Sequence, residues 1–66
     1  MQRTSLTKRE VQVLELLIQG KADKDIAAAL NLTVRTVRFH VSHIFIKKGV
    51  NTRAELLACE LGRSRG

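Results

Sequence analysis

The sequence has no proline, tryptophan or tyrosine, and it has only two phenylalanines and one cysteine among its 66 residues. No apolar run approaches the roughly 20 residues that span a bilayer, and residues 1–10 lack the apolar core of a signal peptide. We therefore expect a soluble protein that is not exported. The single Cys59 excludes an internal disulfide framework and fits a reducing, cytoplasmic setting, where a free cysteine usually serves as a small buried apolar side chain.

Acidic residues are missing from the middle of the chain, where none occurs between Asp25 and Glu55. The segment of residues 33–53 nevertheless carries five positive charges, those of Arg35, Arg38, Lys47, Lys48 and Arg53. The formal net charge of the chain is +6, which favours a polyanionic partner because neutralising phosphates releases counterions. We interpret residues 33–53 as an uninterrupted basic surface and expect nucleic acid as the partner.

The spacing of the apolar residues predicts an all-α fold. Apolar side chains recur three and four residues apart, in a chain without proline to interrupt a helix. We predict one domain over residues 1–66, with flexible segments at 1–5 and 63–66 and four helices at about residues 8–19, 23–30, 34–48 and 53–61. Because so small a domain builds only a marginal core, a dimer would add stability.

Signals for helix starts support three of these helices. Thr7 with Glu10, and Thr52 with Glu55, have the spacing of a capping box, in which each residue's side chain bonds to the other's backbone N–H. Thr33 is the predicted N-cap of the third helix. These signals favour a domain that folds by itself.

The predicted helix ends carry signals of their own. Gly20 is expected to end the first helix in the left-handed conformation, Asn31 can adopt that conformation after the second helix, and Gly49 is expected to close the third. Ala22 offers no capping oxygen to the second helix, which removes a contribution of about 1 kcal/mol unless Asp23 supplies the cap.

Helical-wheel positions predict which side chains are buried. In the first helix the inward side chains are Val11, Leu14, Leu17 and Ile18. Along residues 34–48 the buried stripe consists of Val37, Val41 and Ile44, and the opposite side consists of Arg35, Phe39, Ser42 and Ile46. In the fourth helix two apolar sides are present, one with Leu57 and one with Leu56, and the wheel does not decide which of them docks on the domain.

The second and third predicted helices form a helix-turn-helix layout. The first of the pair is short, a turn of about three or four residues follows, and the second is basic on its outer face. A helix with one apolar face and one face of arginine, serine and histidine suits insertion into a polyanionic groove. The pattern therefore indicates a DNA-binding protein.

The chain resembles the DNA-binding domain of the LuxR/FixJ family, also called the GerE-type domain. The resemblance covers about residues 6–60 and rests on the segments 6–10, 13–14, Gly20, 24–27, 36–40, Ile44, 47–50 and Arg53. It implies a transcription regulator with a four-helix fold, either free-standing or the output domain of a longer response regulator. It also implies that the fourth helix mediates dimerisation on double-stranded DNA.

The resemblance also assigns contacts. It places Arg35, Arg38, Phe39 and Ser42 at the bases of the major groove, and it places phosphate contacts at Thr7, Lys24, Thr36, Lys47, Asn51 and Thr52. To the phosphate contacts we add three residues by their own chemistry, namely His43, Lys48 and Arg53. We expect the dimer interface at Leu56, Leu57, Cys59 and Glu60, and we regard RNA polymerase as a further candidate partner.

Other classes of function fit the sequence less well. His40 and His43 are three residues apart, but a metal site needs further ligands, so we expect no metal. We find neither a nucleophile with a base nor a glycine-rich phosphate loop, so we expect no enzyme, no cofactor and no small-molecule site. Two alternatives stay open: a small adaptor of the transcription machinery with weak, non-specific DNA affinity, and a membrane-active cationic peptide.

Overall fold

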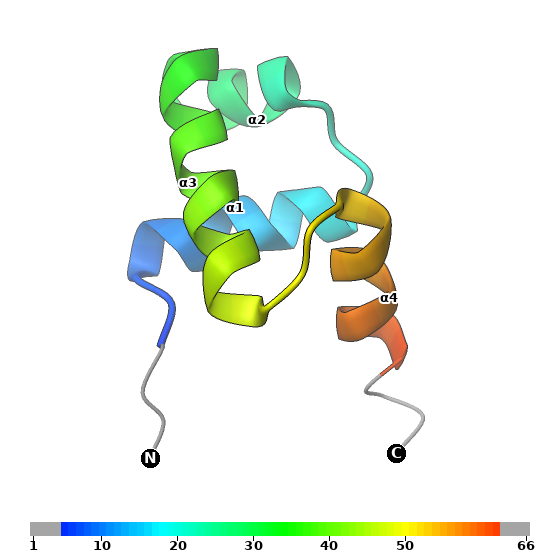
Figure 1. Cartoon of the computed structure of the whole chain (residues 1–66). Helices are drawn as coiled ribbons and strands as arrows, with labels where there is room; N and C mark the ends of the chain where they lie inside the picture. The colour runs from blue at the N-terminus through cyan, green and yellow to red at the C-terminus, as the bar shows by residue number, and fades with distance from the viewer. Residues whose placement is uncertain (1–4, 63–66) are drawn as a thin grey trace.

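A computed structural model of the chain describes residues 5–62 and contains four α-helices (Figure 1). They are α1 (Lys8–Ile18), α2 (Asp23–Leu30), α3 (Val34–Lys48) and α4 (Arg53–Gly62). The prediction of an all-α fold is confirmed, and every predicted helix boundary lies within one residue of the observed one. The segments predicted to be flexible, 1–5 and 63–66, fall outside the described residues except for Ser5. None of the helices within residues 5–62 has the length and apolarity to cross a membrane.

The predicted N-caps are present at α1 and α3. The Thr7 hydroxyl accepts a hydrogen bond from the Glu10 N–H at 3.1 Å, and the Glu10 carboxylate accepts one from the Thr7 N–H at 3.0 Å. This completes the capping box. At α3 the Thr33 hydroxyl accepts from the Thr36 N–H at 3.1 Å. Each bond satisfies a backbone donor that has no partner inside the helix.

The capping box predicted for α4 forms only in part. The Thr52 hydroxyl accepts from the Glu55 N–H at 3.1 Å, as expected. The Glu55 carboxylate, however, accepts from the N–H of Asn51 at 2.7 Å and not from that of Thr52. The side chain has reached one residue further back along the chain, so the prediction of a reciprocal pair at this helix was wrong.

Three helix ends turn through the left-handed conformation, which was predicted for Gly20 and Asn31. The φ angles are 88° at Gly20, 58° at Asn31 and 71° at Gly49, and the backbone N–H bonds that follow each residue close the last helical turn. The start of α2 is different, because Ala22 makes no side-chain cap. Asp23 does not replace it, since its carboxylate bonds to arginines elsewhere in the fold.

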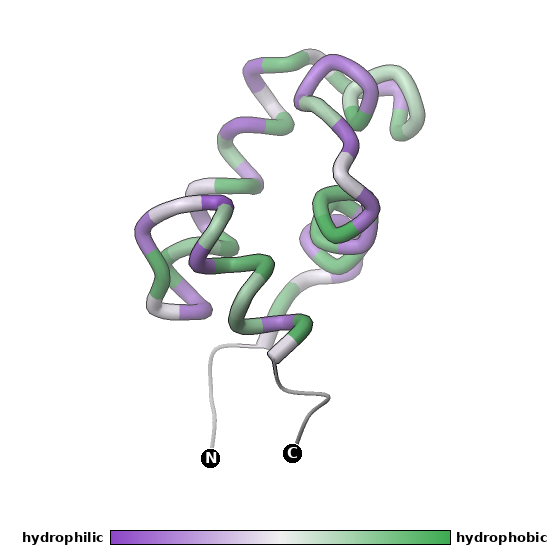
Figure 2. Tube along the Cα trace, turned by 90° about the vertical axis from the view of Figure 1, so that its right-hand side faces the viewer, coloured by the Kyte–Doolittle hydropathy of each residue, from purple (hydrophilic) through white to green (hydrophobic). Residues whose placement is uncertain are grey.

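The helix α3 packs against both α1 and α2, while α4 packs against α1 (Figure 1). Hydrophobic and hydrophilic residues alternate along the helices in Figure 2, as expected where each helix buries one side. The core consists of Val13, Leu14, Leu17, Ile26, Ala27, Val37, Val41, Ile44 and Leu56. The buried stripe predicted for α3 is confirmed in full. Only the outward side of this helix therefore remains for a partner.

The inward side predicted for α1 was partly wrong. Val11 is exposed, whereas Val13 is completely buried and Glu10 is nearly so. The buried stripe follows residues 10, 13, 14 and 17, which also have helical spacing. Because a glutamate stands first in that stripe, the apolar pattern alone indicated a neighbouring side of the helix.

The structure decides the orientation of α4. Leu56 is 0% exposed and belongs to the core, whereas Ala54, Ala58 and Leu61 are exposed. Leu56 therefore has no surface to offer a second copy, and its assignment to a dimer interface was wrong. Leu57, Cys59 and Glu60 are only partly buried, because they lie at the edges of the docked side.

Candidate nucleic-acid interface

The outward side of α3 presents the residues that the sequence predicted there. Arg35, Phe39, Ser42 and Ile46 are all exposed, and so is the side chain of Arg38, at 73%. Their exposure follows from the burial of the opposite stripe, which fixes the rotation of the helix in the fold. Their contacts with bases remain predictions.

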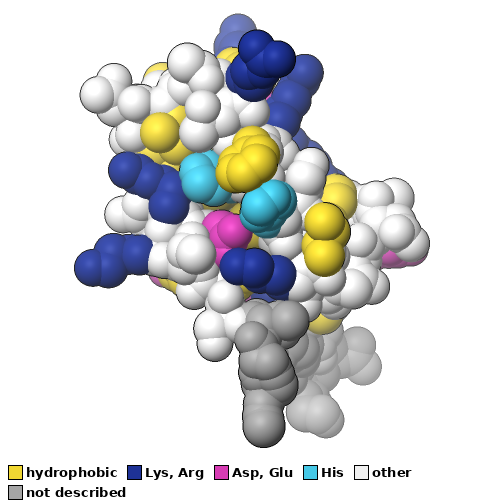
Figure 3. All heavy atoms as spheres, turned by 60° about the vertical axis from the view of Figure 1, so that its left-hand side comes forward, with side chains coloured by type: hydrophobic (Ala, Val, Ile, Leu, Met, Phe, Trp, Pro, Cys, Tyr) yellow, Lys and Arg dark blue, Asp and Glu magenta, His cyan; other side chains and the backbone are white. Residues whose placement is uncertain are grey.

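Phe39 lies at the centre of a small aromatic cluster. Its ring centroid is 4.3 Å from that of His43 and 5.8 Å from that of His40. Figure 3 shows both histidines on one face of the molecule, with basic side chains around them. With 57% of its surface exposed, Phe39 is an apolar contact point inside a polar surface. No group of three or more metal-binding side chains occurs within residues 5–62.

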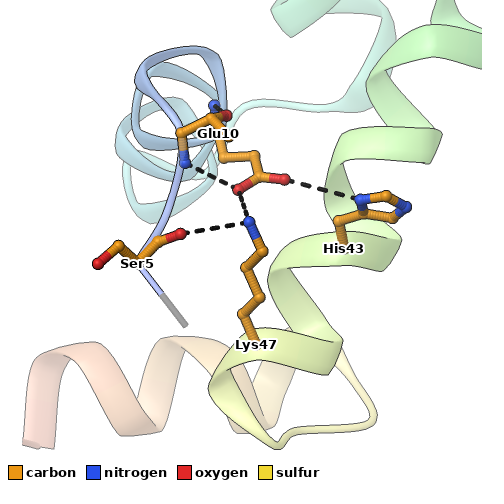
Figure 4. A network of polar contacts seen from close by, with 5 residues as sticks. Ser5, Glu10, His43 and Lys47 are labelled. Atoms are coloured by element: carbon orange, nitrogen blue, oxygen red, sulfur yellow. Dashed lines mark hydrogen bonds and ion pairs between the residues drawn. The ribbon is translucent and has the colours of Figure 1, made fainter. Parts of the chain in front are cut away.

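At the other end of α3, Lys47 belongs to a network that links α3 to α1 (Figure 4). Its ammonium donates to the Glu10 carboxylate at 2.7 Å and to the Ser5 carbonyl at 3.3 Å. The second oxygen of Glu10 lies 3.8 Å from His43 Nδ1. The Glu10 side chain is only 4% exposed, so Lys47 supplies the counter-charge that a buried carboxylate requires.

The pKa of Glu10 is held below its ordinary value. The largest cause is the hydrogen bond from Lys47, followed by the backbone hydrogen bond from Thr7. Burial acts in the opposite direction, because it disfavours the charged form. The ionised carboxylate is thus stabilised by specific donors despite its burial. Glu10 has two structural functions, capping α1 and anchoring α3.

Asp23, the first residue of α2, pairs with two arginines. One carboxylate oxygen accepts from Arg38 Nε at 3.3 Å, and the other accepts from the guanidinium of Arg53. The three residues lie on three different helices. Asp23 therefore joins the start of α2, the outward side of α3 and the start of α4.

Lys48 pairs with Glu60 of α4, with 3.0 Å between Nζ and the carboxylate oxygen. Its side chain is 23% exposed. We predicted a phosphate contact for Lys48; in the structure without DNA, its ammonium instead lies against a carboxylate of the neighbouring helix. The Glu60 carboxylate therefore has its ion-pair partner within the same domain.

The interpretation of residues 33–53 as an uninterrupted basic surface was wrong. Four of its five positive charges pair with carboxylates, and only Arg35 forms no ion pair with a described residue. The carboxylates are those of Glu10, Asp23 and Glu60, which lie outside this segment in the sequence. Sequence reasoning assigned other roles to these three residues and missed their ion pairs with α3. For Glu10 a signal existed, since it begins the helical stripe 10, 13, 14 and 17.

The remaining candidates for phosphate contacts lie mainly at helix starts. Thr7, Lys24, Asn51 and Thr52 are exposed, whereas Thr36 is partly buried and accepts a hydrogen bond from the Thr33 hydroxyl at 3.0 Å. The start of a helix favours anions, because its first N–H groups point outward and its dipole is positive there. The arrangement suits a phosphate backbone.

Comparison with known proteins identifies the family of the chain. The family model described as "Bacterial regulatory proteins, luxR family" matches residues 4–59. The chain therefore belongs to the luxR family of bacterial regulatory proteins, a class of DNA-binding transcription regulators. No solved structure is significantly similar to the chain.

Three relatives illustrate the range of the family. The chain is 48% identical over 50 residues to the spore germination protein GerE of Bacillus subtilis, covering 76% of this chain and 68% of GerE. It is 46% identical over 55 residues to the response regulator Rre1 of Synechocystis sp., covering 83% of this chain and 24% of Rre1. It is 41% identical over 51 residues to the transcriptional regulatory protein LiaR of Bacillus subtilis, covering 77% of this chain and 24% of LiaR. The chain thus spans only about a quarter of the length of the last two.

Proposed function

We propose that this domain regulates transcription by binding double-stranded DNA sequence-specifically, with α3 in the major groove. The observation that carries this proposal is the outward side of α3, where Arg35, Arg38, Phe39 and Ser42 are exposed while the opposite stripe is locked in the core. The major groove admits an α-helix, and its base edges present distinct patterns of hydrogen-bond donors and acceptors.

The four residues offer different chemistry to the bases. Arg38 can donate two hydrogen bonds to O6 and N7 of a guanine, and Phe39 can contact the methyl group of a thymine. Arg35 and Ser42 can hydrogen-bond to base edges on either side of Arg38 and Phe39 along the helix. Together they supply direct readout of a short half-site.

Phosphate contacts would fix the orientation of the domain on the duplex. We assign them first to the exposed residues at helix starts, Thr7, Lys24, Asn51 and Thr52. Thr36 and His43, at the edges of the outward side of α3, are further candidates. Lys47, Lys48 and Arg53 are weaker candidates, because each would have to exchange a carboxylate for a phosphate.

We propose that two copies bind a site with two half-sites, through the exposed side of α4. Ala54, Ala58 and Leu61 are exposed there, and small residues permit close approach of a second helix. An Ala58→Arg substitution should weaken dimers on DNA without unfolding the domain. Sedimentation of the domain with a two-half-site duplex measures this, and unchanged dimerisation would locate the interface elsewhere.

Sequence specificity can be tested by selection from a library of random duplexes, followed by gel-shift titration. The wild-type domain should enrich one motif. Arg38→Ala should relax preference at one base pair of that motif, by about 1–3 kcal/mol, and retain it at the others. Equal affinity for all duplexes would contradict the proposal and favour an adaptor with weak DNA affinity.

A further inference from the structure

We propose that Asp23 is a positioning residue for base recognition, which holds Arg38 by its Nε so that the terminal nitrogens of the guanidinium are presented to a guanine. This inference rests on the proposed function, because it concerns the same side of α3. Asp23 itself does not have to touch DNA. Its effect is exerted through the conformation of Arg38.

The geometry of the carboxylate supports this inference. Asp23 uses one oxygen for Arg38 Nε, at 3.3 Å, and the other for Arg53. Its side chain is 21% exposed and stands on the first residue of α2. Because Arg53 pairs with the same carboxylate from another helix, the carboxylate lies between α3 and α4 and can orient Arg38.

The choice of nitrogen matters for readout. A guanidinium has five N–H donors, one of them on Nε and four on the terminal nitrogens. Arg38 makes no other ion pair or hydrogen bond with residues 5–62, so its terminal nitrogens are available for the O6 and N7 atoms of a guanine. A side chain that is already oriented loses less conformational freedom when DNA binds.

A purely electrostatic effect of Asp23 must be separated from positioning. Any carboxylate near the DNA repels phosphates, so its removal should raise the affinity for every duplex. Asp25 provides a matched control, because it lies in the same first turn of α2, is exposed and pairs with no described arginine. Asp23→Ala and Asp25→Ala remove the same charge, but only the first removes the contact with Arg38.

The experiment compares two duplexes for each variant. One carries the motif selected by the wild-type domain, and the other replaces the base pair at which Arg38→Ala relaxes preference. Fluorescence anisotropy measures the two dissociation constants. Discrimination is the dissociation constant for the altered duplex divided by that for the selected motif. We expect Asp23→Ala to lower this ratio by about two- to tenfold, and Asp25→Ala to leave it unchanged. In an Arg38→Ala background, Asp23→Ala should change the ratio no further.

A second measurement needs no DNA. The Nε–H signal of Arg38 in a heteronuclear NMR spectrum should exchange slowly in the wild-type domain and in Asp25→Ala, and quickly in Asp23→Ala.

If the wild type discriminates between the duplexes and Asp23→Ala discriminates equally well, the inference is wrong while the proposed function stands. If the wild type itself shows no base preference, the proposed function fails, and the inference fails with it.

Discussion

The two halves of α3 carry the same number of positive charges but hold them in different environments. In the first half, Arg35 is exposed without an ion-pair partner among residues 5–62, and Arg38 is exposed while touching one carboxylate. In the second half, Lys47 and Lys48 are about one quarter exposed, and each pairs with a carboxylate of another helix. The first half can therefore offer its charges to DNA, whereas the second half uses them to hold the domain together.

The difference shows that counting positive charges does not count the charges available to phosphates. A carboxylate that is buried must have a partner, because water no longer solvates it. Glu10 is such a carboxylate, and it determines the position of the Lys47 ammonium. Arg35 forms no ion pair with a described carboxylate. Each half can be tested by removing its charge and measuring stability and DNA binding separately.

The largest expected effect is on stability. Lys47→Met keeps most of the aliphatic stem but leaves the Glu10 carboxylate without its main donor. We expect the free energy of unfolding to fall by about 1–3 kcal/mol, measured by urea denaturation. Arg35→Met, the matched change in the first half, should stay within about 0.5 kcal/mol of the wild type. Equal effects of the two substitutions would refute the distinction between the halves.

The second prediction concerns pH. Because the pKa of Glu10 is lowered in the folded state, the unfolded chain binds a proton more readily than the folded one. The stabilisation is present above the ordinary pKa of 4.5 and is lost as pH falls through the lower, folded pKa. Thermal unfolding at pH values from neutral to about 3 measures this. In Lys47→Met the decline in this range should be shallower, since the main cause of the lowered pKa is gone.

The third prediction concerns the salt dependence of DNA binding. If Arg35 contacts a phosphate in addition to the bases, Arg35→Ala should reduce the log–log slope of affinity against salt by about 0.9. Lys48→Ala should change the slope less, because its ammonium is already neutralised by Glu60. Gel-shift titrations at several salt concentrations give both slopes. A larger change for Lys48→Ala would mean that DNA displaces Glu60.

The smallest effect is expected for the Lys48–Glu60 pair itself. Both side chains are largely buried, at 23% and 14% exposure, and the Glu60 oxygen that faces Lys48 makes no hydrogen bond with a described residue, so the cost of desolvation offsets much of their attraction. A double-mutant cycle with Lys48→Ala and Glu60→Ala should give a coupling energy of about 0.2–1 kcal/mol. A coupling energy as large as the loss of unfolding free energy in Lys47→Met would show that the two ion pairs in the second half of α3 contribute equally to stability.

Local signals predicted most of the fold. The capping box of α1, the cap at Thr33 and the left-handed residues Gly20, Asn31 and Gly49 depend on neighbours within a few residues, so the sequence specifies them directly. The single misplaced bond at the start of α4 is a choice between two adjacent N–H groups. Spacing alone cannot resolve that choice.

The candidate interface was predictable in its position and not in its electrostatics. The apolar stripe of α3 determines which residues face outward, so the exposure of Arg35, Phe39 and Ser42 could be predicted. The partners of Arg38 and Lys47 could not, since Asp23 and Glu10 are 15 and 37 residues away in the chain. Nothing in the local sequence of α3 indicates which carboxylates will be packed against it.

The sequence by itself thus determined four helices, their ends and the outward side of α3, because hydrogen bonds within a few residues and helical periodicity decide these features. Tertiary structure alone decided that Glu10 is buried, that Leu56 belongs to the core and that four of the five charges in residues 33–53 are paired. The physical reason is that burial and ion pairing depend on which helix surfaces meet. The residues that come together there are far apart along the chain, and no local pattern indicates their pairing.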